Sequence, residues 1–173
     1  DALGAVQTFS TTVRADGTYS VDVPALLAEG PYTAVANVNG PGGTTASASD
    51  NGEIDITLPL ITVDAPALTN DTTPPLTGTT NLPAGSIVTL TITDALGAVQ
   101  TVTATVVAGG TYSVDVLAAL AEGTFTVVAT ASDAAGNSAT ANDSGALDIT
   151  APTLTVDAPA LTGCERVAGG VAH

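Results

Sequence analysis

Lysine, tryptophan and methionine are absent from these 173 residues, and cysteine and histidine occur once each. Two arginines stand against 17 acidic residues, which gives a net charge of -15 at pH 7. Nucleic-acid surfaces need clustered Lys and Arg, and anionic membranes attract the same residues, so neither is an expected partner. The lone cysteine, Cys164, excludes an internal disulfide bond.

Aromatic residues are also scarce, at 3% of the chain, although 45% of all residues are hydrophobic. The apolar residues are mostly Ala, Val, Leu and Ile, which predicts a folded chain with a thin core rather than a disordered acidic one. No apolar run reaches the ~20 residues that a membrane helix needs. A signal peptide is not visible either, because residue 1 already lies inside a repeated sequence.

Catalytic motifs are missing as well. The single histidine, His173, lies outside the repeated sequence, so no Ser-His-Asp or Cys-His arrangement belongs to the repeat. The HExxH, P-loop and GxGxxG patterns do not occur. The sequence alone leaves open a carboxylate pair for glycoside hydrolysis, but aromatic residues for sugar stacking are few. We therefore expect that the chain is not an enzyme.

A long internal repeat is the main feature that is present. The eight letters "DALGAVQT" begin at Asp1 and again at Asp94, and "DIT" begins at Asp55 and again at Asp148, in both cases 93 residues later. About 34 of 57 aligned positions are identical without a gap, which predicts a tandem array of one domain type. The same spacing relates "GTYSVDV" at Gly17 and Gly110, "LAEG" at Leu27 and Leu120, and "TVDAPALT" at Thr62 and Thr155.

The repeat divides the chain. We expect residues 1–60 to be the C-terminal part of a truncated repeat, residues 61–153 a complete repeat, and residues 154–162 the first strand of a third. The first copy starts inside a hairpin-turn sequence, which indicates that the chain begins in mid-domain. Residues 1–57 have no counterpart of residues 61–93, so exposed edges and an incomplete core are expected there.

The repeat pattern stops after Thr162, where "GCERVAGGVAH" replaces the expected "NDTTPPLTG". Residues 163–173 are therefore expected to form a non-repeat, disordered tail. Two origins fit this sequence. It is either a non-native or out-of-frame end, or a true C-terminus with its own role.

Alternating apolar and polar residues predict strands throughout the repeat, as in "SIVTLTIT", "TVTATV", "TYSVDV" and "TFTVVAT". About seven short strands in 93 residues predict an all-β, immunoglobulin-like antiparallel β-sandwich. "VLAALAEG" is expected to cross between strands, with one helical turn as the alternative. "EGPYTAVA" and "EGTFTVVA" place Tyr32 and Phe125 as in a tyrosine corner, with a packing role because Phe125 lacks the hydroxyl.

The turn "SDAAGN" is the best candidate for a metal site. Asp133 and Asn137 offer the hard oxygen ligands that Ca²⁺ prefers, and the loop is expected at the end where the preceding domain joins. Asp55 is the last carboxylate of that preceding domain and is expected to complete the site. The alternative is an ordinary Asp/Asn/Gly turn. The first copy has Gly40 and Thr44 at the ligand positions, so it is expected to have lost the site.

A second set of candidate ligands is expected at the opposite end of the unit. Asn70 and Asp71 follow "ALT" and are expected near Asp148 and Glu122. The alternative is a solvated turn before an edge strand marked by proline. Asp64 lies in a strand-like stretch near the linker, where it either adds a ligand or faces water.

Two segments carry a family resemblance: "VVATASDAAGNSATA" and "DITAPTLTVDAPALTNDTTPPLTGTT". With the 93-residue period, they resemble the bacterial Ig-like repeats of giant secreted adhesins, both RTX-type and biofilm-associated, which are exported by type I secretion. This resemblance implies an extracellular extender in a cell-surface stalk, with Ca²⁺ at domain junctions and neighbouring repeats as partners. Other modules would then bind host-surface or matrix glycans or proteins. The alternative is that each Ig-like unit itself binds a glycan or a protein.

Overall fold

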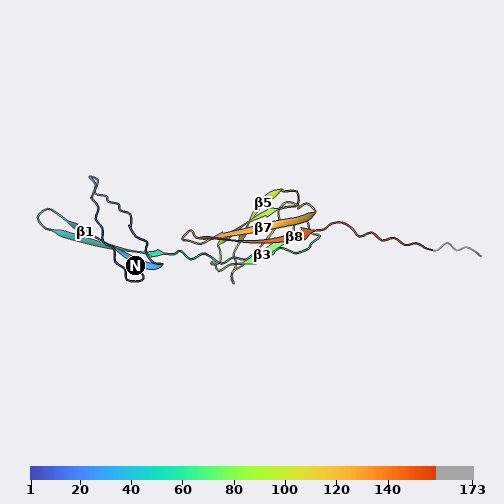
Figure 1. Cartoon of the computed structure of the whole chain (residues 1–173), viewed down its shortest axis with the longest axis horizontal. Coiled ribbons are helices and arrows are strands. Elements are labelled where there is room, and N and C mark those ends of the chain that lie inside the picture. Colours follow the sequence, from blue (N-terminus) through green and yellow to red (C-terminus); the bar gives the residue numbers. More distant parts are fainter. Residues whose placement is uncertain (159–173) are drawn as a thin grey trace, which may run out of the picture.

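The computed structural model describes residues 1–158, which contain strands and no helix (Figure 1). No helix able to cross a membrane is therefore found in this part of the chain. Residues 159–162 of the expected third repeat and the tail 163–173, with Cys164 and His173, lie outside the described residues. The strands are β1 (Gly30–Asn39), β2 (Thr45–Ile54), β3 (Pro75–Thr79), β4 (Ile87–Thr93), β5 (Val99–Thr105), β6 (Thr111–Asp115), β7 (Gly123–Ser132) and β8 (Ser138–Leu147).

The unit from residue 61 onward is built from two antiparallel sheets, one of order β5-β4-β7-β8 and one of order β3-β6 (Figure 1). Residues 61–69 connect the sheets. Asp64 pairs with Thr77 of β3, and Thr69 pairs in parallel with Leu147 of β8. This segment therefore holds the two sheets together along one side, and the predicted β-sandwich is the fold that results.

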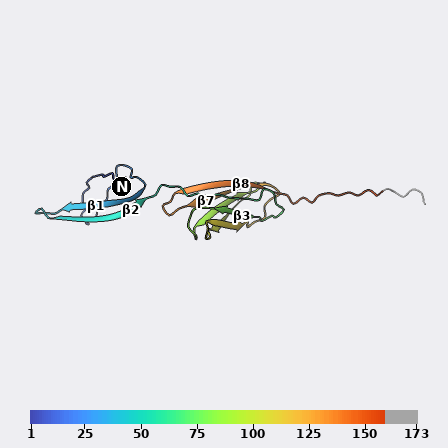
Figure 2. The ribbon, with the colours of Figure 1, turned by 90° about the horizontal axis from the view of Figure 1, so that it is seen from below.

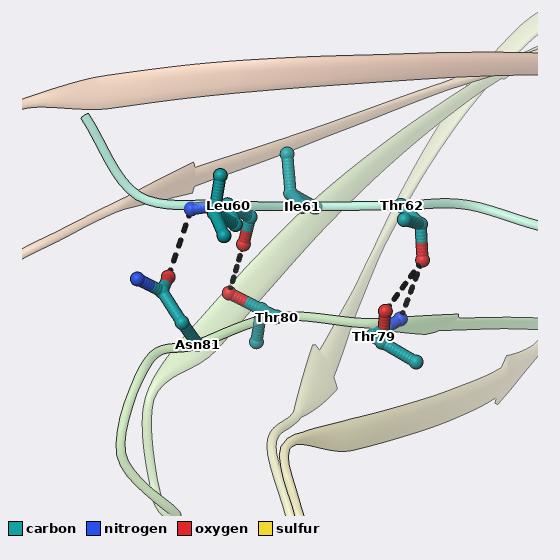
Figure 3. Close-up of a pocket in the computed structure, with 6 residues that line it drawn as sticks. All are labelled: Leu60, Ile61, Thr62, Thr79, Thr80 and Asn81. Atoms are coloured by element: carbon teal, nitrogen blue, oxygen red, sulfur yellow. Dashed lines mark hydrogen bonds between the residues drawn. The ribbon is translucent and has the colours of Figure 1, made fainter.

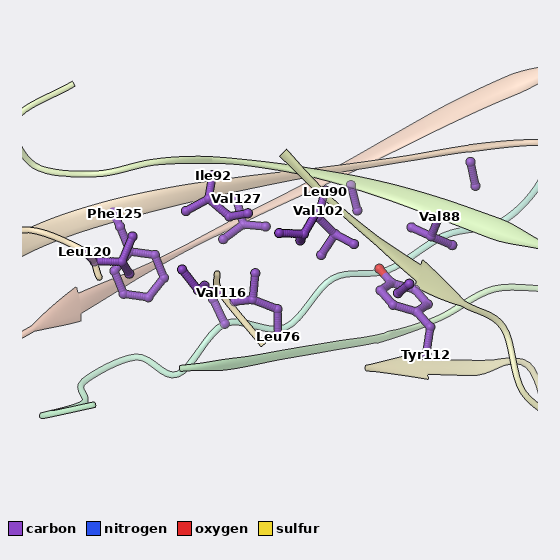
Figure 4. Close-up of a cluster of buried hydrophobic side chains, with 14 of the residues drawn as sticks. Leu76, Val88, Leu90, Ile92, Val102, Tyr112, Val116, Leu120, Phe125 and Val127 are labelled. Carbon is purple, nitrogen blue, oxygen red and sulfur yellow. The ribbon is translucent and has the colours of Figure 1, made fainter. Parts of the chain in front are cut away.

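The core of this unit lies between the two sheets. The alternation of apolar and polar residues along each strand explains which side chains enter it. In β4, Val88, Leu90 and Ile92 are fully buried, whereas Thr89 and Thr91 between them point away from the core. Figure 4 shows the buried side chains meeting in one layer. The cluster comprises Ala65, Leu76, Leu82, Val88, Leu90, Ile92, Val102, Ala104, Val106, Tyr112, Val116, Leu120, Phe125, Val127, Ala129, Ala131 and Leu147.

Aromatic rings lie directly across from glycines in three strand pairs. Phe125 of β7 pairs with Gly145 of β8. A methyl group added at Gly145 would overlap the Phe125 ring. The same relation joins Tyr112 to Gly78 between β6 and β3, and Tyr32 to Gly52 between β1 and β2. The glycine leaves room for the ring to lie flat over the backbone, and the ring covers a position that has no side chain. Tyr32 and Phe125 therefore have the packing role that the sequence indicated.

Residues 1–60 contain a single hairpin, β1–β2, which corresponds to β7–β8 of the complete unit. "TYSVD" forms strand β6 at residues 111–115, yet the identical letters at residues 18–22 form no strand. The difference is the partner: β6 pairs with β3, and residues 1–60 have no counterpart of β3 or β4. Tertiary context therefore decides whether this sequence is a strand.

Burial differs between the two copies in the same way. Tyr112 is 2% exposed and its counterpart Tyr19 is 55% exposed, while Val116 is 2% exposed and Val23 is 48% exposed. Within residues 1–60 no strand covers these side chains, so they are exposed. Phe9, Val13, Val21 and Val38 are exposed as well.

The segment "VLAALAEG" forms a loop between β6 and β7 without a helical turn, so it is the predicted crossover. The Gln100 side chain fixes it, because Nε2 donates to the Ala118 carbonyl (3.0 Å) and Oε1 accepts from the Ala118 N–H (2.9 Å). In the first copy Gln7 makes the same two hydrogen bonds to Ala25, at 3.1 and 3.2 Å. The crossover therefore keeps its local conformation where the neighbouring strands are absent.

Candidate junction site

A short linker, residues 55–60, joins the two parts of the chain, which follow one another along the long axis (Figures 1 and 2). Its downstream end is held by two neighbouring side chains of the complete unit (Figure 3). The Leu60 N–H donates to Asn81 Oδ1 at 2.8 Å, and Thr80 Oγ1 donates to the Leu60 carbonyl at 2.7 Å. The linker therefore enters the complete unit in one fixed direction.

The upstream end of the linker is bound to the same unit through the β7–β8 turn. Asn137 Nδ2 donates to the backbone carbonyl of Asp55 at 3.1 Å, across 82 positions of sequence. The structure therefore brings two of the three predicted junction residues, Asp55 and Asn137, into contact. Since both ends of a six-residue linker are hydrogen bonded to one unit, its path is restricted without any added ligand.

Asp133, the third predicted residue, shapes the turn that carries Asn137. Asp133 Oδ1 accepts the N–H groups of Ala135 and Asn137, both at 2.9 Å, and Oδ2 accepts Asn137 Nδ2 at 2.9 Å. The Asn137 side chain, helped by these backbone N–H groups, lowers the pKa of Asp133 below its ordinary value of 3.8. Asp133 is thus an ionised carboxylate beside the linker at neutral pH.

The hydrogen bonds of Asp133 are those of a turn that occurs elsewhere in the chain. Asp94 Oδ1 accepts the N–H groups of Leu96 and Ala98, at 3.0 and 2.9 Å, in the same pattern. An Asx turn therefore accounts for the Asp133 conformation by itself. The two turns differ in the partner of the second carboxylate oxygen. Asp94 Oδ2 accepts from the Ala121 N–H of its own unit (3.2 Å), whereas Asp133 Oδ2 accepts from Asn137, which also bonds to the linker.

The first copy lacks these groups at the equivalent turn. Gly40 and Thr44 are bonded only through their backbones, with the Gly40 N–H donating to the Thr44 carbonyl at 2.7 Å. No carboxylate stands at this turn, so the two copies present different surfaces at this end.

The second predicted cluster lies at the opposite end of the sandwich. The Asp148 N–H donates to the Thr69 carbonyl at 2.9 Å, which places Asp148 close to the turn carrying Asp71. Each carboxylate binds locally: Asp71 Oδ1 accepts the Thr73 N–H (2.9 Å), and Asp148 Oδ1 accepts the Thr150 N–H (3.0 Å). They act as turn caps in this structure.

Asp64 is exposed in the middle of the segment that pairs with β3. Over residues 1–158, no group of three or more acidic, histidine or cysteine side chains is close enough to hold a metal ion. Asn137 therefore bonds both to the Asp55 backbone carbonyl and to Asp133. Within residues 1–158 neither these residues nor Asp64, Asp71 and Asp148 form a cluster of metal-binding side chains.

Two structural contacts were missed by the sequence reasoning. Asp143 Oδ2 accepts the N–H of buried Ala65 at 2.8 Å and so holds residues 61–69 against β8. Thr80 and Asn81 hold Leu60, as described above. A sequence signal existed for the first contact, since Asp143 is an acidic residue in a strand and its counterpart Asp50 is also acidic.

A groove lies beside the linker, and Figure 3 shows the residues that line it. Its lining consists of Leu60, Ile61, Thr62, Thr79, Thr80 and Asn81. It is open and has no aromatic side chain on which a sugar ring could stack. Thr80 and Asn81 are already bonded to Leu60 of the linker, and the Thr62 and Thr79 hydroxyls are bonded to each other, so this groove gives no support to a glycan site.

Acid is expected to destabilise the complete unit. Asp94, Asp133 and Asp143 all have pKa values lowered below 3.8, mainly by the Ala98 N–H, the Asn137 side chain and the Ala65 N–H respectively. In the unfolded chain these carboxylates take up protons at a higher pH than in the folded one. Their stabilising contribution is therefore present above about pH 4 and is lost as pH falls through the lowered values.

The measurement is a thermal melt at several pH values between 7 and 2. An Asp143→Asn variant provides the comparison, because its amide oxygen still accepts the Ala65 N–H but does not titrate. The variant should show a smaller fall in Tm between pH 5 and pH 2 than the unchanged chain. An unchanged Tm over that range in the wild-type chain would contradict the prediction.

Two antiparallel sheets packed around one core, with a first segment bonded to both sheets, define an immunoglobulin-like β-sandwich. Residues 62–157, more than half of the chain, match the family of bacterial Ig-like domains, and the chain belongs to that family. The family and the fold expected from the sequence are thereby confirmed. None of the curated proteins matches the chain.

Solved structures of large adhesins are similar to the chain. The tetra-tandem repeat in the extending region of a large adhesion protein is 34% identical with a TM-score of 0.53, over 80% of this chain and 37% of that one. A Ca²⁺-stabilized adhesin that helps an Antarctic bacterium reach out and bind ice is 30% identical (TM-score 0.41, 79% and 36% coverage). A 1.5-MDa bacterial ice-binding adhesin, described for host cell surface retention, is 26% identical (TM-score 0.36, 68% and 41%). The chain spans about two fifths of each of these structures.

Proposed function

We propose that the chain is an extender segment of a bacterial surface adhesin, which spaces a binding module away from the cell. The observation that carries this proposal is the likeness to the repeats of an adhesin's extending region, at 34% identity over most of the chain. The junction supports it, because a linker bonded at both ends suits a unit whose task is to hold its neighbour in line. Such an extender lies outside the cell and has neighbouring repeats as its immediate partners. Export by type I secretion, an RTX-type parent protein and a part in biofilms belong to the same proposal.

Ca²⁺ at the junction is the finer part of the proposal, and the donor chemistry fits it. Asn137 Nδ2 lies 2.9 Å from Asp133 Oδ2 and 3.1 Å from the Asp55 carbonyl, so it stands between two oxygens. The amide oxygen is on the other arm of the same group, and a half turn about the last side-chain bond exchanges the two. Carboxylate, carbonyl and amide oxygens are the ligands that Ca²⁺ prefers, with water completing its shell.

A bound Ca²⁺ would supply positive charge that joins oxygens of two successive units. The residues of this chain would do the rest: the turn orients Asp133. Without the ion Asn137 Nδ2 holds the Asp55 carbonyl, and with the ion bound the Asn137 and Asp55 oxygens would be held by the ion in place of that hydrogen bond. Asp71 and Asp148 are candidates for a second site at the other end, completed by the next repeat. Asp64 is a candidate for an additional ligand on the segment that follows the linker. Since each turn is already satisfied by its own hydrogen bonds, the ion would add stiffness to a junction that is formed without it.

The test is a thermal melt of the whole chain with millimolar Ca²⁺, with chelator, and with Mg²⁺ as an ion control. Ca²⁺ is expected to raise Tm, by an amount that corresponds to about 2.7 kcal/mol at 100 times its Kd. An Asp133→Ala variant should lose this response. Asp94→Ala is the matched control, because it removes the same kind of turn cap away from the linker and should keep the response.

Equal responses of the two variants would place any Ca²⁺ effect elsewhere, and no response of the unchanged chain would remove the metal from the proposal. The extender role is tested separately by small-angle scattering. An extended particle of narrow length distribution is expected, whereas a compact particle with the two parts folded together would contradict a spacer.

A further inference from the structure

The outer face of the β5-β4-β7-β8 sheet carries no charged residue, although the complete unit is acidic and has no basic residue at all. We call it the uncharged face. It consists of the odd-numbered residues of β4 and β5 and the even-numbered residues of β7 and β8, which alternate with the buried ones. Threonine is the commonest of them, with Ser, Asn, Val, Ile and Ala at the other positions.

The carboxylates of the complete unit lie elsewhere. Asp94 and Asp133 are in turns at the ends of strands, and Asp143 accepts a backbone N–H on the inner side of β8. Asp64 and Asp115 are exposed on the outer face of the β3–β6 sheet. The others, in segments between strands, are Asp71, Glu122 and Asp148. Of the two sheet faces of this unit, the uncharged face is therefore the one on which two acidic copies can approach without opposing carboxylates.

The first copy keeps this surface uncharged although its residues differ. In the β1–β2 hairpin, Asn37 stands in place of Thr130 and Ser49 in place of Asn142. The exception is Glu53, at the end of β2 next to the linker. The two copies therefore share the kind of surface here and not the particular residues.

The side chains of the uncharged face can pair with their own kind. A Thr or Ser hydroxyl both donates and accepts a hydrogen bond, whereas a carboxylate only accepts. This makes the face self-complementary, as an interface between two identical copies requires. The strand register also aligns the β-branched side chains, which suits the packing of one sheet on another. One row across the four strands consists of Thr103, Thr89, Thr130 and Thr140.

The size of the face sets the strength of such a contact. Four strands about 4.8 Å apart, each with residues about 6.7 Å apart on one side, give a face of about 20 Å by 25 Å. Two copies would then bury about 1,000 Å² in total, which is the lower limit for a specific interface. We therefore expect a single pair of units to associate weakly and reversibly.

We propose that the uncharged face is a contact surface for the same face of a second copy of the chain, so that two units pack side by side through their larger sheets. This proposal goes beyond the extender role and does not depend on it, because an extender can remain single and a chain of another role can pair. In a protein with many such repeats, the weak contacts of successive units would add up.

The experiment is sedimentation of the full chain at concentrations from about 10 µM to about 1 mM, the range in which a weak interface is populated. A chelator is present, so that no metal ion bridges carboxylates. The mass is expected to rise with concentration toward twice that of one chain. More salt should strengthen the association, since it screens the carboxylates at the ends of the two sheets. A mass that stays at one chain throughout would overturn the proposal.

Variants locate the contact. Val128 is 40% exposed and lies between Thr91 and Asn142 near the middle of the face. Val128→Asp should weaken association by about tenfold or more, because it opposes like charges in the contact. Ser113→Asp is the matched control, since it adds the same charge on the outer face of the β3–β6 sheet and should associate like the unchanged chain. Equal effects of the two variants, or none from Val128→Asp, would show that another surface associates and would overturn the proposal.

A mixture of two variants guards against a simple folding defect. Val128→Lys and Val128→Asp chains should each associate poorly alone, and their mixture should associate more tightly than either, because opposite charges then meet in the contact. A misfolded variant cannot give this result. A mixture that stays as weak as the Val128→Asp chain alone would overturn the proposed packing.

Discussion

Replacing Phe125 by alanine is expected to lower the free energy of unfolding of the complete unit by about 3–5 kcal/mol. Phe125 is the largest fully buried side chain of the core, and it is the only aromatic ring on β7. Its loss removes the cover over Gly145 as well as the apolar area between the sheets. In a core built from Val, Leu, Ile and Ala, no neighbour is large enough to fill the space.

The measurement is urea unfolding of the whole chain, followed by circular dichroism at a wavelength that reports strands. Thr126→Ala is the control, because Thr126 is the next residue on β7 and is exposed. The control should stay within about 0.5 kcal/mol of the unchanged chain. A Phe125→Ala variant as stable as the control would show that the sheets can close over the cavity.

Replacing Gly78 by alanine is expected to lower the free energy of unfolding of the complete unit by about 3 kcal/mol. A methyl group at this position would overlap both the Thr62 carbonyl and the Tyr112 hydroxyl, which are hydrogen bonded to each other. One of the overlapping atoms is backbone, so the strand itself has to move. The expected result is a weakened attachment of residues 61–69 to the β3–β6 sheet.

Thr77→Ala provides the comparison, since Thr77 is adjacent on β3 and exposed. Hydrogen exchange can separate local from global effects. Faster exchange of the Thr62 and Asp64 N–H groups, which are bonded to Thr79 and Thr77, is expected in Gly78→Ala and not in the control. Unchanged exchange and an unchanged unfolding midpoint would refute the proposed crowding.

The fold could be predicted from the sequence because the complete repeat is locally consistent. Alternation in β4, β5 and β7 points the same side chains inward that the structure buries, and the turns at Gly97 and Gly136 carry the positive φ angles that suit glycine. Local sequence was not sufficient for residues 18–22, which have the letters of β6 but no strand. Their state depends on a partner far away in sequence, and alternation carries no information about whether that partner is present.

The position of the candidate site could be predicted in part, because its turn is encoded in a short local sequence. The turn chemistry of Asp133 and Asn137 is local, and the topology of an Ig-like fold places that turn beside the preceding linker, so the proximity of Asp55 followed. The hydrogen bonds of Leu60 to Thr80 and Asn81 were not foreseen, because they depend on how the linker crosses the end of a sheet. All the metal-ligand roles stay predictions, those of Asp55, Asp133 and Asn137 as well as those of Asp64, Asp71 and Asp148.

The parallel pairing of residues 67–69 with the end of β8 has a mechanical consequence for a chain held at both ends. The Thr69 N–H and carbonyl bond to Ala146 and Asp148, both at 2.9 Å, and the Ala146 N–H bonds to Ala67 at 3.1 Å. The chain enters this segment at one end of the sandwich and leaves from β8 at the other. A pull along the long axis therefore slides these two neighbouring segments past each other, so that tension is shared among several hydrogen bonds in shear instead of opening them one after another.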